Sequence, residues 1–170
     1  MNIYVELLKE QEQFSAILNS LKLQNSPIRI TGTCETQKVH LAFSLCHELS
    51  KSMLYVVPDA LTAKFIVEDL KFFAEGKVRY YPQADMVFRK VDAKSNENAS
   101  ERIKVLNDLL NGEQLFVVTT IQALAQKTVN ISEFKNSMIE IKTGDIIPIE
   151  DFSSKLASIG YKREANVESH

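Results

Sequence analysis

An eight-residue stretch of the chain has the spacing of a phosphate-binding loop, which follows the pattern G-x-x-x-x-G-K-[ST] between a strand and a helix. Gly32 occupies the position of the first glycine, and Lys38 occupies that of the lysine. Residues 28–30 form a short strand candidate before the stretch, and a pattern of helical spacing follows it. In such a loop, backbone N–H groups and the lysine amine hold the phosphates of a nucleotide.

Three residues of this loop lack the chemistry that a bound nucleotide needs. Gln37 replaces the second glycine, whose missing side chain lets the loop wrap closely around the phosphates. Val39 replaces the hydroxyl residue that binds Mg²⁺, and Glu35 adds a carboxylate where a polyanion would lie. We therefore expect a vestigial loop that binds neither nucleotide nor metal. A chance match to the motif and a live nucleotide site are the alternatives.

An ATP hydrolase would also need an acidic residue after a buried strand to hold the metal. The best candidate strand, residues 115–118, runs into Thr119 and Thr120 and has no carboxylate there. This absence is a second indication against ATP hydrolysis, and we expect no catalytic residue in the chain.

The remaining side chains with nucleophilic or metal-binding chemistry are scattered along the sequence. His40, His47 and His170 have no spacing that would build a metal site or a catalytic triad. The two cysteines, Cys34 and Cys46, are not spaced as metal ligands either, and we expect both to be reduced and structural.

The bulk composition is that of an ordinary domain with a buried core. The chain has 170 residues, 45% of them hydrophobic and 25% charged, and a net charge of -2. This balance excludes the broad positive field on which non-specific DNA binding relies. No signal segment opens the sequence, and no apolar run approaches the roughly 20 residues that span a bilayer, so we expect a cytoplasmic protein without a membrane partner.

Strand and helix patterns alternate through the first part of the chain. This order favours an α/β fold with a mostly parallel sheet and helices on both faces, as in P-loop NTPases and helicases. We expect Asp59 to be a helix N-cap, and we expect the first long apolar strand to be covered on both faces. The expected helices are 38–51, 59–76 and 100–112, and the expected strands are 28–30, 53–57, 78–81 and 115–118.

The pattern changes after about residue 125. Residues 138–141 alternate between apolar and polar side chains, residues 149–159 have helical spacing, and Gly160 follows at the C′ position. Residues 162–167 are a candidate last strand. We therefore expect a P-loop-like α/β domain at 1–125 and the start of a small α+β domain at 126–170.

Several stretches, in order along nearly the whole chain, resemble the N-terminal region of the bacterial transcription-repair coupling factor (Mfd) family. No single stretch is diagnostic, and the series carries the resemblance. It comprises Ile30-Thr31-Gly32, Lys38-Val39-His40-Leu41-Ala42, Tyr55-Val56-Val57-Pro58-Asp59, Ala63, Glu68-Asp69-Leu70, Phe72-Phe73, Tyr81-Pro82, Asp85, Ser95, Glu97, Arg102-Ile103, Val105-Leu106, Val117-Val118-Thr119-Thr120-Ile121, Ala123-Leu124, Gly144-Asp145, Gly160-Tyr161 and Arg163.

The resemblance implies a module that is similar in fold to the excision-repair protein UvrB but has a decayed nucleotide loop. It implies recruitment of the damage-recognition ATPase UvrA and restraint of the parent protein's activity. ATP and Mg²⁺ would serve motor domains of the parent that this sequence lacks, and RNA polymerase and DNA would also bind through absent domains. The main UvrA contacts are expected beyond residue 170, with Lys162 and Arg163 as candidate contributors.

Two other classes of function compete with this interpretation. The first is the N-terminal part of an active P-loop ATPase or helicase such as UvrB, which Gln37 and Val39 disfavour. The second is a nucleic-acid-binding domain, which the charge balance disfavours. Its candidate stacking residues lie in apolar patterns that are typical of a core: Tyr55, Phe72, Phe73, Tyr80 and Tyr81.

Overall fold

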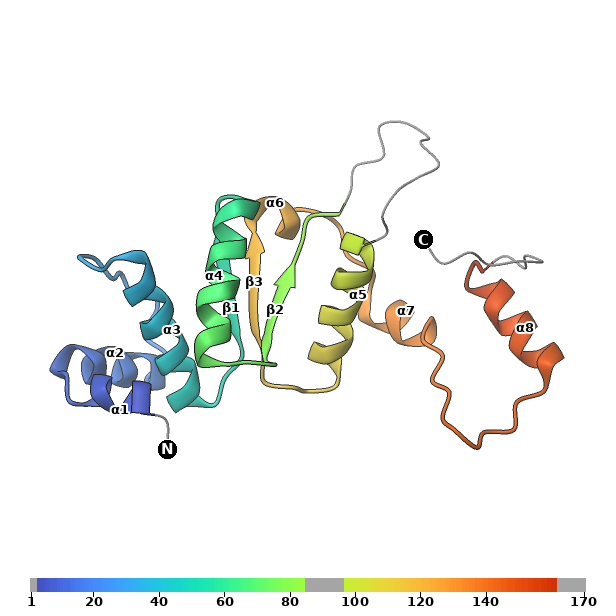
Figure 1. Cartoon of the computed structure of the whole chain (residues 1–170), viewed down its shortest axis with the longest axis horizontal. Coiled ribbons are helices and arrows are strands. Elements are labelled where there is room, and N and C mark those ends of the chain that lie inside the picture. Colours follow the sequence, from blue (N-terminus) through green and yellow to red (C-terminus); the bar gives the residue numbers. More distant parts are fainter. Residues whose placement is uncertain (1–2, 85–96, 162–170) are drawn as a thin grey trace. The chain divides into compact units, whose positions relative to one another are not determined.

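The computed structural model of the chain describes residues 3–84 and 97–161 (Figure 1). It divides into two compact units, Met1–Gln126 and Lys127–His170, which are described separately below. The expected domains at 1–125 and 126–170 stay predictions, since this division is not a test of independent folding. None of the helices in the described residues is long and apolar enough to span a membrane.

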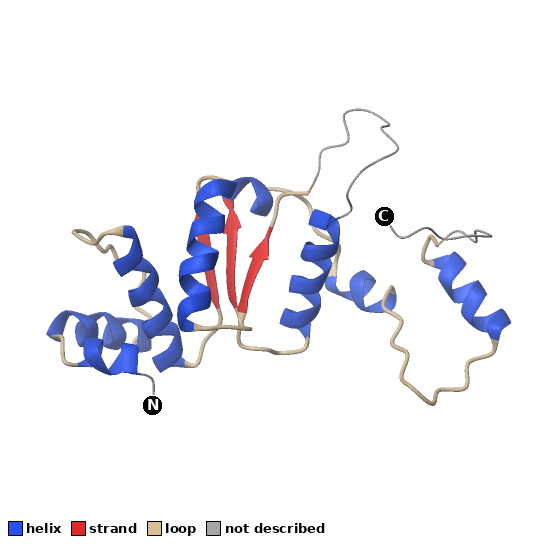
Figure 2. Cartoon of the chain, in the orientation of Figure 1, coloured by secondary structure: helices blue, strands red, loops and turns tan. Residues whose placement is uncertain are grey.

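The centre of the first unit is a small open sheet of three parallel strands in the order β1-β3-β2 (Figure 2). The strands are β1 (Met53–Val57), β2 (Val78–Tyr81) and β3 (Phe116–Thr120). Tyr55 of β1 and Tyr80 of β2 both lie opposite Val118 of β3. The expected α/β class and its parallel sheet are therefore confirmed, whereas the P-loop helicase-like assignment stays a prediction.

Six helices accompany this sheet in the described part of the first unit. Asp59 caps the helix after β1, because its carboxylate accepts hydrogen bonds from the Thr62 N–H at 2.8 Å and the Thr62 hydroxyl at 2.9 Å. This agrees with the expected N-cap. The helices are α1 (Ile3–Lys9), α2 (Glu12–Lys22), α3 (Glu35–Leu49), α4 (Ala60–Phe73), α5 (Glu97–Leu110) and α6 (Ile121–Leu124).

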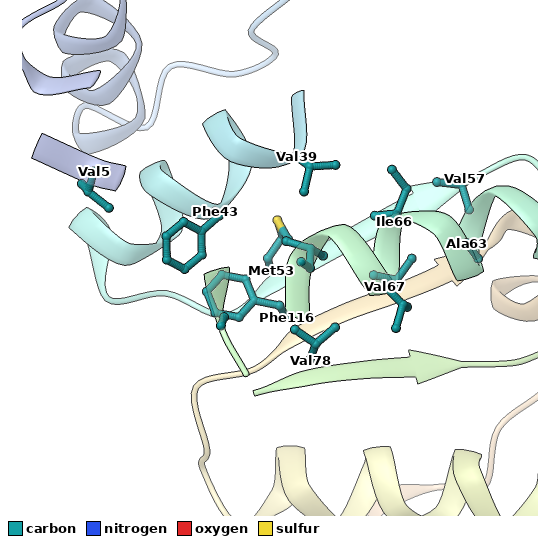
Figure 3. Close-up of a cluster of buried hydrophobic side chains, with 13 residues drawn as sticks. Val5, Val39, Phe43, Met53, Val57, Ala63, Ile66, Val67, Val78 and Phe116 are labelled. Carbon is teal, nitrogen blue, oxygen red and sulfur yellow. The ribbon is translucent and has the colours of Figure 1, made fainter. Parts of the chain in front are cut away.

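Two clusters of buried side chains lie on opposite faces of the sheet, because they take alternate residues of β3. Phe116 and Val118 belong to the cluster that α3 and α4 cover (Figure 3). Leu115 and Val117 belong to the other, together with Val105 of α5. The helix α4, between β1 and β2, and the helix α5, between β2 and β3, thus cover different faces of the sheet. The strand order requires this, because the two connections run in opposite directions across the sheet and right-handed crossovers then place their helices on opposite faces.

The expected burial of β1 on both faces is wrong. Leu54 is 57% exposed and Val56 is 43% exposed, although Met53 and Val57 on the same strand are buried. The reason is the position of β1 at the edge of the sheet: α5 packs against β2, and no described helix covers the same face at β1. A continuous apolar run cannot show which of its two faces will be covered.

The expected strand at residues 28–30 is also wrong, because these residues belong to none of the described strands. Ile30 is exposed and Ile28 is only half-buried, so the segment adds no buried side chain to the core. The Ser26–Pro27 peptide just before it is cis. The following helix begins at Glu35, three residues before the expected start at 38.

Aromatic side chains attach the N-terminal helices to the sheet. Phe73 of α4 stacks on His40 at 5.1 Å and on Phe43 at 5.3 Å between ring centroids, and Phe43 lies 5.5 Å from Phe116 of β3. His40 Nε2 lies 2.8 Å from the backbone oxygen of Tyr4. His40 therefore contacts both α1 and α4 through its ring.

The second unit has two short helices in its described residues, α7 (Ile131–Asn136) and α8 (Ile149–Ser158). Residues 138–141, expected as part of an α+β unit, form no strand, and the candidate strand at 162–167 lies outside the described residues. No described residue of this unit is fully buried. Residues 138–141 have no partner strand within the described residues. Alternating apolar and polar side chains do not stabilise a strand that has no partner.

Candidate functional site

The side chain of Gln37, in the first turn of α3, bonds back to the residue before the helix. Gly32 has a φ of +80°, a left-handed conformation that favours glycine, and Cys34 is the N-cap residue that precedes the helix. Gln37 Oε1 accepts a hydrogen bond from the Cys34 N–H at 3.0 Å. In a working phosphate loop the backbone N–H groups at this position face the ligand. In this chain the Gln37 side chain accepts a hydrogen bond from one of these N–H groups. Gln37 stands at the position of the motif's second glycine.

Lys38 is turned toward the protein's own carboxylate. Its Nζ forms an ion pair with Glu35, one helical turn earlier, and both side chains are exposed. The hydrogen bond to Glu35 raises the pKa of Lys38, so the ammonium stays charged but is already partnered. An incoming phosphate would have to displace Glu35 and would then lie beside its negative charge.

Val39 is fully buried and belongs to the same core cluster as Met53 and Ile66 (Figure 3). The position that carries the metal-binding hydroxyl in a working loop thus faces the protein interior. Both the residue type and its surroundings prevent a Mg²⁺ ligand at this position.

The carboxyl end of β3 uses its two threonines for structure. The Thr119 hydroxyl donates to the backbone oxygen of Tyr81 at 2.8 Å, which ties β3 to β2. The Thr120 hydroxyl accepts from the Ala123 N–H at 3.2 Å and caps α6. Neither residue is acidic, and across residues 3–84 and 97–161 no group of three or more His, Cys, Asp or Glu side chains is placed to hold a metal ion.

A polar cluster at the same end of the sheet was not expected as a site from the sequence. The buried Arg102 of α5 lies 4.2 Å above the Tyr81 ring and donates to the Pro82 backbone oxygen at 2.8 Å. Gln126 exchanges two hydrogen bonds with the backbone of Ala84, at 2.7 and 3.1 Å. The available signal was that Arg102 falls on the apolar face of its helix, three residues before Val105. These contacts join α5 to the end of β2, so we interpret the cluster as structural.

The candidate base-stacking residues are mostly part of the core. Tyr81 is buried, and Tyr55, Tyr80 and Phe73 are half-buried against the clusters described above. Burial raises the pKa values of Tyr55 and Tyr80. Phe72 is exposed, but its ring lies 5.4 Å from that of Tyr4. Of these five candidates, only Phe72 is exposed, so the other four are placed as core residues rather than as a base-stacking surface.

Lys162 and Arg163, the two candidate partner-binding residues, lie outside the described residues. The structure thus brings Gly32, Gln37, Lys38 and Val39 together at the start of α3, each in a role within the protein's own fold.

No protein-family profile matches the chain. Curated proteins named transcription-repair-coupling factor do match it. The protein from Bacillus subtilis (strain 168) is 25% identical over 157 residues, which cover 92% of the chain. The protein from Staphylococcus aureus (strain USA300) is 26% identical over 168 residues, which cover 98% of the chain.

The predicted resemblance to these coupling factors is confirmed. The match is consistent with the N-terminal region of that family. The chain spans only 13% to 14% of the length of the coupling factors that it matches.

Proposed function

We propose that this chain is a non-catalytic, UvrB-like module of a transcription-repair coupling factor, acting in transcription-coupled nucleotide excision repair. In this role it recruits UvrA and restrains the ATP-dependent DNA translocase to which it is joined. The proposed fold is a P-loop-derived α/β domain followed by a smaller unit, and the proposed location is the cytoplasm.

The observation that carries the non-catalytic role is the hydrogen bond from the Cys34 N–H to Gln37 Oε1 at 3.0 Å. This bond supports the proposal because it occupies a backbone donor at the helix N-terminus with the protein's own amide oxygen. The ion pair of Lys38 with Glu35 and the burial of Val39 support the same conclusion. Thr119 and Thr120, which follow the buried strand in place of an acid, disfavour the alternative of an active UvrB-type ATPase.

Cofactors and most partners belong, in this proposal, to parts of the parent protein outside these residues. ATP and Mg²⁺ serve its motor domains, and DNA and RNA polymerase bind through other domains. The module contributes a protein-binding surface, for which Lys162 and Arg163 remain the proposed residues in this sequence.

A replacement experiment tests the proposed role. The matched 157 residues of the Bacillus subtilis coupling factor would be exchanged for this chain, and UvrA binding and ATP hydrolysis would be measured with the purified chimera. We expect UvrA binding and a restrained hydrolysis rate, as in the unaltered factor. A matched deletion of the same residues should lose the restraint. A folded chimera that neither binds UvrA nor restrains hydrolysis would contradict the proposal.

The isolated chain provides a second measurement. We expect UvrA to bind it weakly or not at all in calorimetry, because the main contact residues are expected beyond residue 170. A complex with a dissociation constant in the low micromolar range would show that these 170 residues already hold the recruiting surface.

A further inference from the structure

We draw no further inference here: the strongest candidate, the apolar surface patch that Leu61, Phe65 and Phe72 form along the exposed side of α4, carries nothing because nothing in the structure shows what covers it.

Discussion

At the scale of single residues, the start of α3 has the spacing of a phosphate-binding loop, but its side chains bond within the protein itself. A helix N-terminus has unsatisfied N–H groups and a favourable dipole for negative charge. In this chain the Gln37 amide oxygen and the Glu35 carboxylate occupy these surroundings, and Val39 is directed into the interior. Restoring the motif one residue at a time should therefore disturb the fold rather than create a site.

Val39→Thr tests this view. The substitution restores the hydroxyl of the motif, but at a position with no exposed surface and an apolar environment. We expect the free energy of unfolding to fall by about 1–3 kcal/mol, because a buried hydroxyl without a partner is costly. Urea unfolding followed by circular dichroism measures this change. Val39→Ile, which adds only a methylene, is the control for volume; an unchanged midpoint for the threonine variant would show that the position is not tightly enclosed.

The two cysteines should differ in reactivity. Cys34 is exposed, whereas Cys46 is half-buried and burial raises the pKa of its thiol. The thiolate is the reactive form, and a raised pKa lowers its population at neutral pH. Iodoacetamide should therefore modify Cys34 first, as mass spectrometry of the digested protein would show. Equal rates at both positions would mean that α3 opens readily.

At the scale of elements, the N-cap of α4 couples folding to pH. The backbone hydrogen bond from the Thr62 N–H, followed by that from the Thr62 hydroxyl, lowers the pKa of Asp59. Since the folded-state pKa is depressed, ionised Asp59 stabilises the fold at neutral pH, and this contribution is lost as the pH falls below about 4.

Asp59→Ala should lower the melting temperature by a few degrees at neutral pH and by much less in acid, because the cap is then already protonated. Thermal unfolding at both pH values measures the difference, and Asp69→Ala, elsewhere on the same helix, is the control. A similar loss at both pH values would indicate that the carboxylate charge has no role in the cap.

Sequence patterns predicted those helices and strands whose structure is determined by local signals in their own residues. The apolar run at Met53–Val57, the strand Val78–Tyr81 and the helix that Asp59 starts were all predictable, because propensity, capping and periodicity agree there. Residues 28–30 were predicted wrongly, since pairing depends on a neighbour that local sequence does not specify. For the same reason, neither the exposed face of β1 nor the contact of Arg102 with Tyr81 could be predicted.

The residue types of the candidate site could be read from the sequence, but their contacts could not. Gln37 and Val39 depart from the motif by residue type alone, so the sequence by itself is enough to predict a loop without nucleotide, and this stays a prediction. That Gln37 bonds back to Cys34, and that Val39 enters the core, depends on where α3 begins and how it packs. The helix starts three residues earlier than its apolar pattern indicates, because polar residues form its first turn.

At the scale of the whole molecule, the two units differ in how much they bury. The first unit has two core clusters, whereas the described residues 127–161 have none. The helix α8 has half-buried apolar side chains at Phe152 and Leu156, followed by the half-buried C-cap residue Ile159. Helices of this length are marginal in water without tertiary packing.

A peptide of residues 127–170 should therefore be largely unfolded by itself. Its circular dichroism should be that of a disordered chain with a small helical fraction and no cooperative melting. Residues 1–126 expressed alone should melt cooperatively and serve as the comparison. A cooperative transition in the peptide would mean that it has a core of its own.

Calorimetric titration of the full chain with Mg²⁺ and ATP tests most directly whether the turn before α3 can hold a triphosphate. We predict no saturable heat at ATP concentrations up to the order of 1 mM, because Gln37, Glu35 and Val39 occupy the positions that phosphates and metal require. Stoichiometric binding that needs Mg²⁺ and is abolished by Lys38→Ala would contradict this, and with it the non-catalytic function proposed for the chain.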